Sequence, residues 1–259
     1  MQSLSFQATT NKNKDLSLSL ILTGTKLFAE ENMFKTVLFD LDDTIFDFKK
    51  SERAALIKTF NEIGIEPDEM LLNRYSIINQ QWWKRLERRE ITRHEVKVGR
   101  YRELFDEFGI ILSPEKATAV YEEMLCNGHY FVDGAEKMLD ELYDSYDLYL
   151  VSNGAKRVQD SRLASAGISH YFKGIFISEE VGFEKPAPEF FDYCFKKMNN
   201  ADKRNAIIIG DSLTSDIKGG INAGIKTVWF NPDKKANLTE IIPDYEIEDL
   251  LQIKEILEL

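Results

Sequence analysis

The sequence KTVLFDLDDT, residues 35–44, decides the fold of this chain. It is a short apolar run that ends in two carboxylates, Asp40 and Asp42, one residue apart. Because apolar, β-branched and aromatic residues fill buried strands, the run predicts a core strand with both carboxylates at its carboxyl end.

Composition is that of a globular protein with an acidic surface. The chain has 259 residues, is 43% hydrophobic and carries a net charge of −11, so it can bury a large core in one or two domains. The negative charge argues against a nucleic acid polymer as partner. Its two cysteines, Cys126 and Cys194, lack metal-ligand spacing and are expected to be buried packing residues in the cytoplasm.

The N-terminal segment, residues 1–32, precedes Met33 and the first strand. Its apolar part, residues 16–23, resembles a short signal sequence but is interrupted by serines. No stretch reaches the roughly 18 apolar residues of a membrane span, so we expect no membrane contact. We expect residues 1–32 to lie outside the fold.

A helical region separates the first strand from the rest of the predicted sheet. A helix is predicted from Ser51 to Gly64, and three more helical patterns follow up to Cys126 without a strand between them. From Asp133 onward, helices alternate with short apolar strands, which is typical of a parallel sheet covered on both faces. The sequence predicts an α/β core, residues 33–48 and 130–259, interrupted by an all-helical cap, residues 49–129.

Polar side chains follow several predicted strands. The carboxyl ends of parallel strands meet at one edge of the sheet, where ligands bind. The residues at these positions are Asp40, Asp42, Ser152, Asn153 and Asp211, and Lys185 lies in a turn-rich segment before a helix. Converging carboxylates repel one another unless a cation is present, and oxygen ligands without histidine or cysteine favour Mg²⁺. With Lys185 and Ser152, the group would suit a phosphoryl substrate.

Four ordered motifs resemble those of the haloacid dehalogenase superfamily. They are Asp40-Leu-Asp42-Asp-Thr44, Ser152-Asn-Gly, Lys185-Pro and Gly210-Asp211-Ser-Leu-Thr-Ser-Asp216. The resemblance implies a Rossmann-like core with a C1-type helical cap. It implies that Asp40 is the nucleophile, that Asp42 is the general acid and base, and that Ser152, Asn153, Lys185 and Thr44 contact phosphate. The implied ligands of Mg²⁺ are Asp40, the backbone carbonyl of Asp42, Asp211 and Asp216.

Two further residues of the first motif, Asp43 and Thr44, are expected to have structural roles. Strand alternation sends Asp43 away from Asp42, so it is expected to stabilise a turn or cap a helix. Thr44 is expected also to bond the local backbone.

The second aspartate favours a phosphatase. An alkoxide leaving group needs a proton when phosphate is transferred, whereas a halide does not. Residues 181–191 and Asn153-Gly154 are similar to the 5′-nucleotidase branch, so the expected partner is a small phosphorylated metabolite, most simply a nucleoside 5′-monophosphate. A sugar-phosphate phosphatase, a phosphomutase and an inactive binding scaffold stay as alternatives. The expected oligomeric state is a monomer or weak homodimer.

The predicted cap contains a basic run. Between Trp82 and Arg102 there are eight Lys or Arg against three Glu. A solvated helix face with i,i+4 pairs explains such a run. The alternative is that one arginine, with Trp82 or Trp83, reaches over the site toward a substrate.

Overall fold

The core is a six-stranded, fully parallel sheet in the order β3-β2-β1-β4-β5-β6. The computed structural model describes residues 34–198 and 201–258, so the expected N-terminal extension lies outside the described residues. The strands are β1 Thr36–Phe39, β2 Asp147–Ser152, β3 Gly174–Ile177, β4 Ala206–Gly210, β5 Lys226–Phe230 and β6 Tyr245–Ile247. The predicted α/β core is confirmed, and β6, which is only three residues long, was not predicted.

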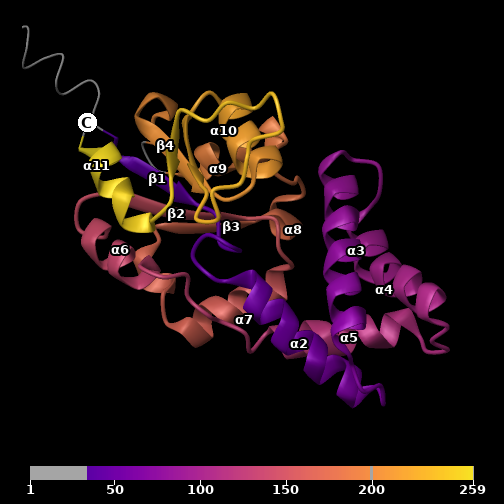
Figure 1. The fold of residues 1–259 in the computed structure, drawn as a ribbon. Coiled ribbons are helices and arrows are strands. Elements are labelled where there is room, and N and C mark those ends of the chain that lie inside the picture. Colours follow the sequence, from indigo (N-terminus) through magenta and orange to yellow (C-terminus); the bar gives the residue numbers. More distant parts are fainter. Residues whose placement is uncertain (1–33, 199–200, 259) are drawn as a thin grey trace, which may run out of the picture.

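Helices cover both faces of the sheet (Figure 1). Successive side chains of a strand point to opposite faces, so Val37 and Phe39 of β1 enter one core while Leu38 enters the other. The first core is closed by α6 Ala135–Leu142, α7 Lys156–Ala166 and α11 Ile253–Leu257. The second is closed by α8 Ser178–Val181, α9 Pro188–Lys197 and α10 Lys218–Ala223. Short 3₁₀ turns span Ser169–Tyr171, Lys203–Asn205 and Leu250–Gln252.

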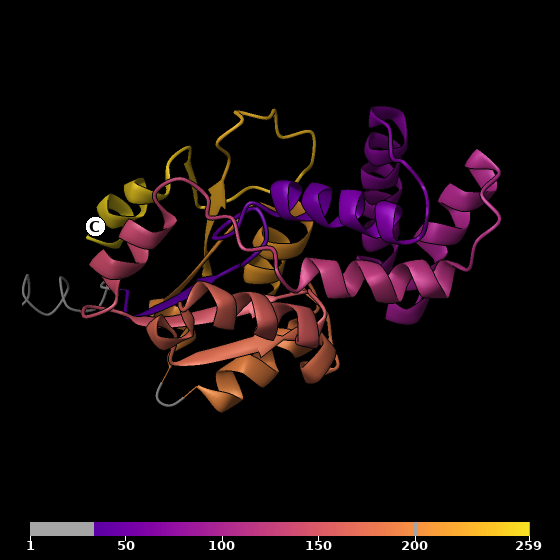
Figure 2. The same ribbon diagram turned by 90° about the horizontal axis from the view of Figure 1, so that it is seen from below.

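Four consecutive helices after β1 form a separate helical layer beside the sheet (Figures 1 and 2). They are α2 Phe48–Glu62, α3 Glu69–Glu87, α4 Arg93–Phe108 and α5 Pro114–Leu125. Their apolar faces share a hydrophobic core of their own, which also takes in Val158 of α7. That these helices act as a distinct domain, bounded at residues 49 and 129, stays a prediction.

Helix α2 begins at Phe48, so the start predicted at Ser51 is wrong by one turn. Two carboxylates explain the earlier start, because each accepts hydrogen bonds from the free N–H groups of the first turn. Asp47 accepts from Lys50 N at 2.9 Å, and Asp43 accepts from Phe48 N at 2.9 Å. The expected capping role of Asp43 is therefore confirmed.

Both cysteines are unbonded and buried, as expected for packing residues. Among the described residues, no helix is long and apolar enough to cross a membrane.

The turn after β4 is shaped by a close approach of Asp216 to the strand end. A π-helical turn, Leu213–Ile217, carries this residue back toward Gly210, where an added Cβ atom would lie 2.4 Å from the Asp216 Cγ atom. Only glycine leaves room for the carboxylate there. The same contact accounts for a glycine at the end of an otherwise apolar strand.

We therefore expect Gly210→Ala to lower the free energy of unfolding by about 1–3 kcal/mol, the usual range for overpacking in a filled core. Urea denaturation would measure the loss. Because the new methyl meets the Cβ atom as well as the carboxylate of Asp216, the same substitution should cost less in an Asp216→Gly background. An equal loss in both backgrounds would contradict this packing account.

Candidate active site

Asp40 lies at the carboxyl end of β1 with its side chain almost fully buried. Its backbone N–H donates to Ile209 O at 2.9 Å, which ties it to the end of the neighbouring strand β4. The ammonium of Lys185, 1% exposed, donates to Asp40 Oδ1 at 2.6 Å, to Asp216 Oδ1 at 2.7 Å and to Val151 O at 2.8 Å. The predicted convergence of the first, third and fourth motifs is thus present.

Three carboxylates surround one point at this end of the sheet. One oxygen each of Asp40, Asp211 and Asp216 lie within 4.8 Å of one another. Burial is the largest cause that raises the pKa of Asp40, to about 8, and the negative charges of Asp216 and Asp42 add to it against the opposing ammonium of Lys185. Burial, and after it the negative charges of Asp216, Asp40 and Asp43, raise the pKa of Asp211 well above its usual range. The three residues therefore fit a hard divalent cation, which would offset their repulsion.

The loop that carries Lys185 is clamped by the second motif. The side chain of Asn153 accepts from Lys185 N at 2.8 Å and donates to Lys185 O at 2.9 Å. Its amide also donates to Ser215 Oγ at 3.2 Å. In this arrangement Asn153 holds the lysine loop in place.

Ser152 has a hydroxyl hydrogen to offer. Its Oγ accepts from Gly154 N at 3.1 Å and from Gln159 Nε2 at 3.0 Å, and it donates to no described residue. Since a serine hydroxyl has one donor, it can donate to a ligand oxygen.

The carboxylate of Asp42 is held by two residues of α7 that sequence reasoning did not select. Arg162, which is fully buried, donates to Asp42 Oδ1 at 2.5 Å, and Gln159 Nε2 donates to Asp42 Oδ2 at 2.6 Å. Arg162 also donates to Gly128 O at 2.6 Å and to Ser51 Oγ at 3.4 Å. One guanidinium thus joins the Asp42 carboxylate to both segments that lead into the helical layer.

Thr44 does not form the expected hydrogen bond with the local backbone. Its hydroxyl is buried and has no hydrogen-bond partner among the described residues. The turn is closed instead by the backbone, since Ile45 N and Phe46 N both donate to Leu41 O. Thr44 is also absent from the residues that line the cavity described next.

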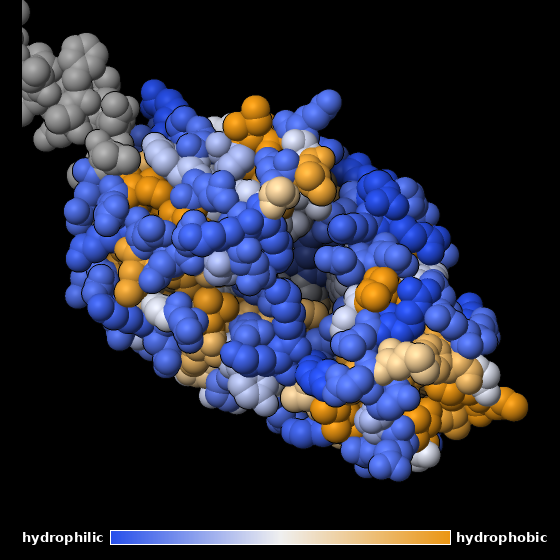
Figure 3. Space-filling model, viewed as in Figure 1, coloured by the Kyte–Doolittle hydropathy of each residue, from blue (hydrophilic) through white to orange (hydrophobic). Residues whose placement is uncertain are grey.

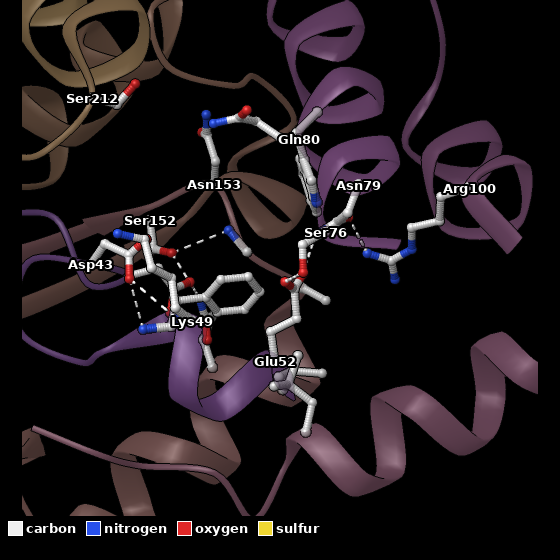
Figure 4. Close-up of a pocket in the computed structure, with 18 of the residues that line it drawn as sticks. Asp43, Lys49, Glu52, Ser76, Asn79, Gln80, Arg100, Ser152, Asn153 and Ser212 are labelled. Atoms are coloured by element: carbon white, nitrogen blue, oxygen red, sulfur yellow. Dashed lines mark hydrogen bonds between the residues drawn. The ribbon is translucent and has the colours of Figure 1, made fainter. Parts of the chain in front are cut away.

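A cavity of about 630 Å³ opens directly above these groups, between the core and the helical layer. Figure 3 shows the hollow on the surface, with polar residues around it. Asp40, Asp42, Ser152, Asn153 and Lys185 line its core side together with Asp211 and Asp216. Helices α2 to α5 supply the opposite wall, where Figure 4 shows Ser76, Asn79 and Gln80 facing the strand-end residues.

An arginine of the basic run does reach across to the core, but it meets protein groups. Arg93 donates to Asn153 O at 2.9 Å, to Ser178 Oγ at 2.5 Å and to Glu184 Oε1 at 3.1 Å. Trp83 lines the cavity, with the Arg93 guanidinium 5.6 Å from its ring centroid. Trp82 lies away from it, with its indole N–H bonded to Glu103 in the helical layer.

The missed residues had little sequence signal. Arg162 and Gln159 stand within a polar helix that has little amphipathic pattern, and only their three-residue spacing places both on the side that faces Asp42. The glycine of the Ser-Asn-Gly motif was a usable hint, because a Cβ atom at Gly154 would lie 2.1 Å from Gln159 Nε2. A close approach by some side chain could have been inferred there.

Comparison with known proteins agrees with this geometry. The family model for haloacid dehalogenase-like hydrolases matches residues 34–224. The chain is 41% identical over 226 residues to the HAD-hydrolase YfnB of Bacillus subtilis, covering 87% of this chain and 96% of that protein. It is 37% identical over 222 residues to the pyrimidine 5′-nucleotidase PynA of Streptococcus pneumoniae, covering 84% and 94%.

A solved structure shares the fold. The crystal structure of YfnB bound to magnesium, which reveals interdomain movement in that protein, superposes with a TM-score of 0.84 at 40% identity and covers 88% of this chain and all of that one. The predicted superfamily and the hydrolase class of enzyme are confirmed. By motif order, sheet topology and similarity over most of its length, the chain belongs to the haloacid dehalogenase-like hydrolases.

Proposed function

We propose that this chain is a Mg²⁺-dependent phosphomonoesterase that hydrolyses nucleoside 5′-monophosphates through an aspartyl-phosphate. The observation that carries the proposal is the buried Asp40 carboxylate at the floor of the cavity, in contact with Lys185 and beside two further aspartates. A nucleophile, an ammonium and a cation site at one point suit phosphoryl transfer, in which negative charge must be neutralised.

The reaction has two steps. An Asp40 oxygen attacks phosphorus, the bond from phosphorus to the ester oxygen breaks, and Asp42 gives a proton to that departing oxygen. Asp42, now a carboxylate, then takes a proton from water as the water attacks the phosphorus of the acyl phosphate. Inorganic phosphate leaves, and Asp40 is free again. Lys185 and the Ser152 hydroxyl hold the phosphoryl oxygens in both steps.

The cation would be held by Asp40, Asp211, Asp216 and the backbone carbonyl of Asp42. When bound, Mg²⁺ supplies positive charge to the phosphoryl oxygens and removes the repulsion among the carboxylates. The mutual approach of the Asp40, Asp211 and Asp216 carboxylates supports this assignment.

Two kinds of relative bear on the substrate. PynA and the Escherichia coli protein YjjG, 27% identical over 221 residues, are both pyrimidine 5′-nucleotidases. A glyceraldehyde 3-phosphate phosphatase of Methanothermobacter thermautotrophicus is 28% identical over 239 residues. The higher identity to PynA favours the nucleotide, and a sugar phosphate stays as the second candidate.

Two free, buried cysteines support a cytoplasmic location.

The nucleophile is tested by substitution. Asp40→Asn should reduce the release of phosphate from UMP by at least about 10⁴-fold, as loss of a covalent nucleophile does in other hydrolases. Asp42→Asn should reduce it by about 10²–10⁴-fold, the usual contribution of a general acid and base. A malachite-green phosphate assay measures both. An Asp40→Asn protein with undiminished turnover would overturn the proposal.

The hold of Arg162 on Asp42 gives a further prediction. Arg162→Met leaves the Asp42 carboxylate to Gln159 alone, so kcat for UMP should fall by about 100-fold, as expected when a reacting group is displaced by about 1 Å. Arg157→Met on the exposed side of the same helix is the control and should change kcat little. Equal rates for wild type and Arg162→Met would show that the contact does not position Asp42.

Metal binding should depend on pH. Without a divalent cation, folded Asp40 retains a proton that the unfolded chain releases, so stability is highest below its ordinary pKa and is lost as pH rises through about 8. Because Mg²⁺ binds the deprotonated carboxylates, the rise in Tm that it causes should be larger at pH 9 than at pH 6. At about 100 times Kd that rise should be roughly 5–10 °C.

Differential scanning fluorimetry with Mg²⁺ or EDTA measures this shift. The Asp211→Asn protein is the matched control and should show a much smaller one. A Mg²⁺ shift in wild type that is independent of pH would contradict the proposed ligands.

A further inference from the structure

One face of α3 lines the cavity opposite the strand ends. Asn73, Ser76, Gln80, Trp83 and Glu87 follow one another at spacings of three, four, three and four residues, so they form a single stripe along the helix. The stripe is polar in its middle and extends beyond what a phosphate group alone would fill. This wall faces the part of a substrate that is not phosphate.

A buried carboxylate lies beside the middle of the stripe. Glu52 of α2 is 6% exposed and lines the cavity. Its Oε2 accepts from Ser76 Oγ at 2.5 Å and its Oε1 accepts from Asn79 Nδ2 at 2.6 Å. Each carboxylate oxygen can accept a second bond, and among the described residues no ammonium or guanidinium pairs directly with Glu52. The group can therefore accept further hydrogen bonds.

Arg100 of α4 orients the Asn79 amide in this network. Its Nη1 donates to Asn79 Oδ1 at 2.7 Å, so the amide of Asn79 must present its nitrogen to Glu52 (Figure 4). Arg100 is itself buried, and its Nε atom has no partner among the described residues. Its Cζ atom lies 5.7, 5.8 and 5.0 Å from the ring centroids of Tyr75, Tyr101 and Tyr121, so Arg100 orients Asn79 from within the helical layer.

We propose that Glu52, Ser76, Asn79 and Arg100 form the subsite that recognises the base of the nucleotide, with Glu52 accepting from an N–H group of a pyrimidine. The ring N3–H of uracil or the amine of cytosine supplies that donor. This proposal rests on the proposed function, since it names the part of the same cavity that reads the substrate beyond its phosphate.

Burial raises the pKa of Glu52, but the hydrogen bonds from Ser76 and Asn79 oppose this shift and favour the anionic form, which would work against other substrates. A second phosphate or a carboxylate placed in this subsite would meet a buried anion, which is unfavourable in a site of low dielectric. Other relatives include an N-acylneuraminate-9-phosphatase of Mus musculus and a ribulose-1,5-bisphosphate 5-phosphatase of Halopiger xanaduensis. Substrates of these kinds carry a second anionic group, and Glu52 selects against them here.

The test is the effect of Glu52→Gln on kcat/KM for three substrates. UMP should lose about 10- to 100-fold, the effect of losing a hydrogen bond to a charged group. Ribose 5-phosphate has no base to contact Glu52, so its kcat/KM should fall by less than about threefold, as for a substitution away from any contact. The kcat/KM for ribulose 1,5-bisphosphate should rise relative to that for UMP, because the buried anion is gone. Glu62→Gln, an exposed residue on the same helix, is the matched control.

A second variant guards against misfolding. Ser76→Ala removes the hydroxyl that holds Glu52 and should lower kcat/KM for UMP by about 2- to 10-fold, as loss of a neutral hydrogen bond does. It should leave the ratio of ribose 5-phosphate to bisphosphate activity close to that of wild type.

The outcomes separate the two proposals. A wild-type enzyme that does not prefer UMP to ribose 5-phosphate overturns the nucleotide assignment and this subsite with it. A clear preference that neither Glu52→Gln nor Ser76→Ala reduces overturns the subsite alone. Equal losses on UMP and ribose 5-phosphate in both variants assign these residues to the structure of the helical layer and also overturn it.

Discussion

The contact of the Lys185 ammonium with Asp40 and Asp216 is the interaction on which the site depends. It places one positive charge between two carboxylates that are buried almost completely, where an unpaired charge would be expensive. The surrounding fold serves this contact. Asn153 clamps the backbone of Lys185, and Gly210 makes room for Asp216 against the end of β4. One ammonium group thus joins the ends of β1 and β2 to two loops.

The described residues leave the charge at this site unbalanced. One ammonium faces three carboxylates, and the pKa of Asp40 is raised to about 8 although Lys185 touches it. Additional positive charge would return Asp40 to its anionic form at neutral pH, and an anionic oxygen is what attack on phosphorus requires. In the proposed mechanism, cation binding and activation of the nucleophile are therefore one event.

The core could be predicted from the sequence because its signals are local. An apolar run followed by a polar residue marks a strand end, and parallel strands bring such ends together, so Asp40, Ser152 and Asp211 are predicted without coordinates. Lys185 is predicted from its turn-rich segment before a helix. The partners of Asp42 could not be found in this way. Arg162 and Gln159 lie on a helix about 120 residues further along the chain, and only the packing of α7 brings them to Asp42. The start of α2 was missed because its first turn is capped by Asp43, which lies within the first motif, and by Asp47, which lies just after it.

The helical layer shows the same limit. Its helices follow from periodicity and capping signals, whereas the Glu52 network joins residues of three helices that have no sequence pattern in common. The proposed catalytic groups lie at the carboxyl end of the sheet and in the loops beside it, and the groups proposed to read the rest of the substrate lie on the helices. Chemistry and selectivity can therefore change independently within one cavity.

The most direct test of the account is to look for the covalent intermediate. The wild-type protein is mixed with UMP and Mg²⁺, quenched in acid during turnover, digested and analysed by mass spectrometry, because loss of Asp42 would slow formation of the intermediate as well as its hydrolysis. The account predicts phosphate on the peptide that contains Asp40, at Asp40 itself, and none in an Asp40→Asn protein. Turnover of UMP with no phosphorylated peptide, or with phosphate on another residue, would contradict it.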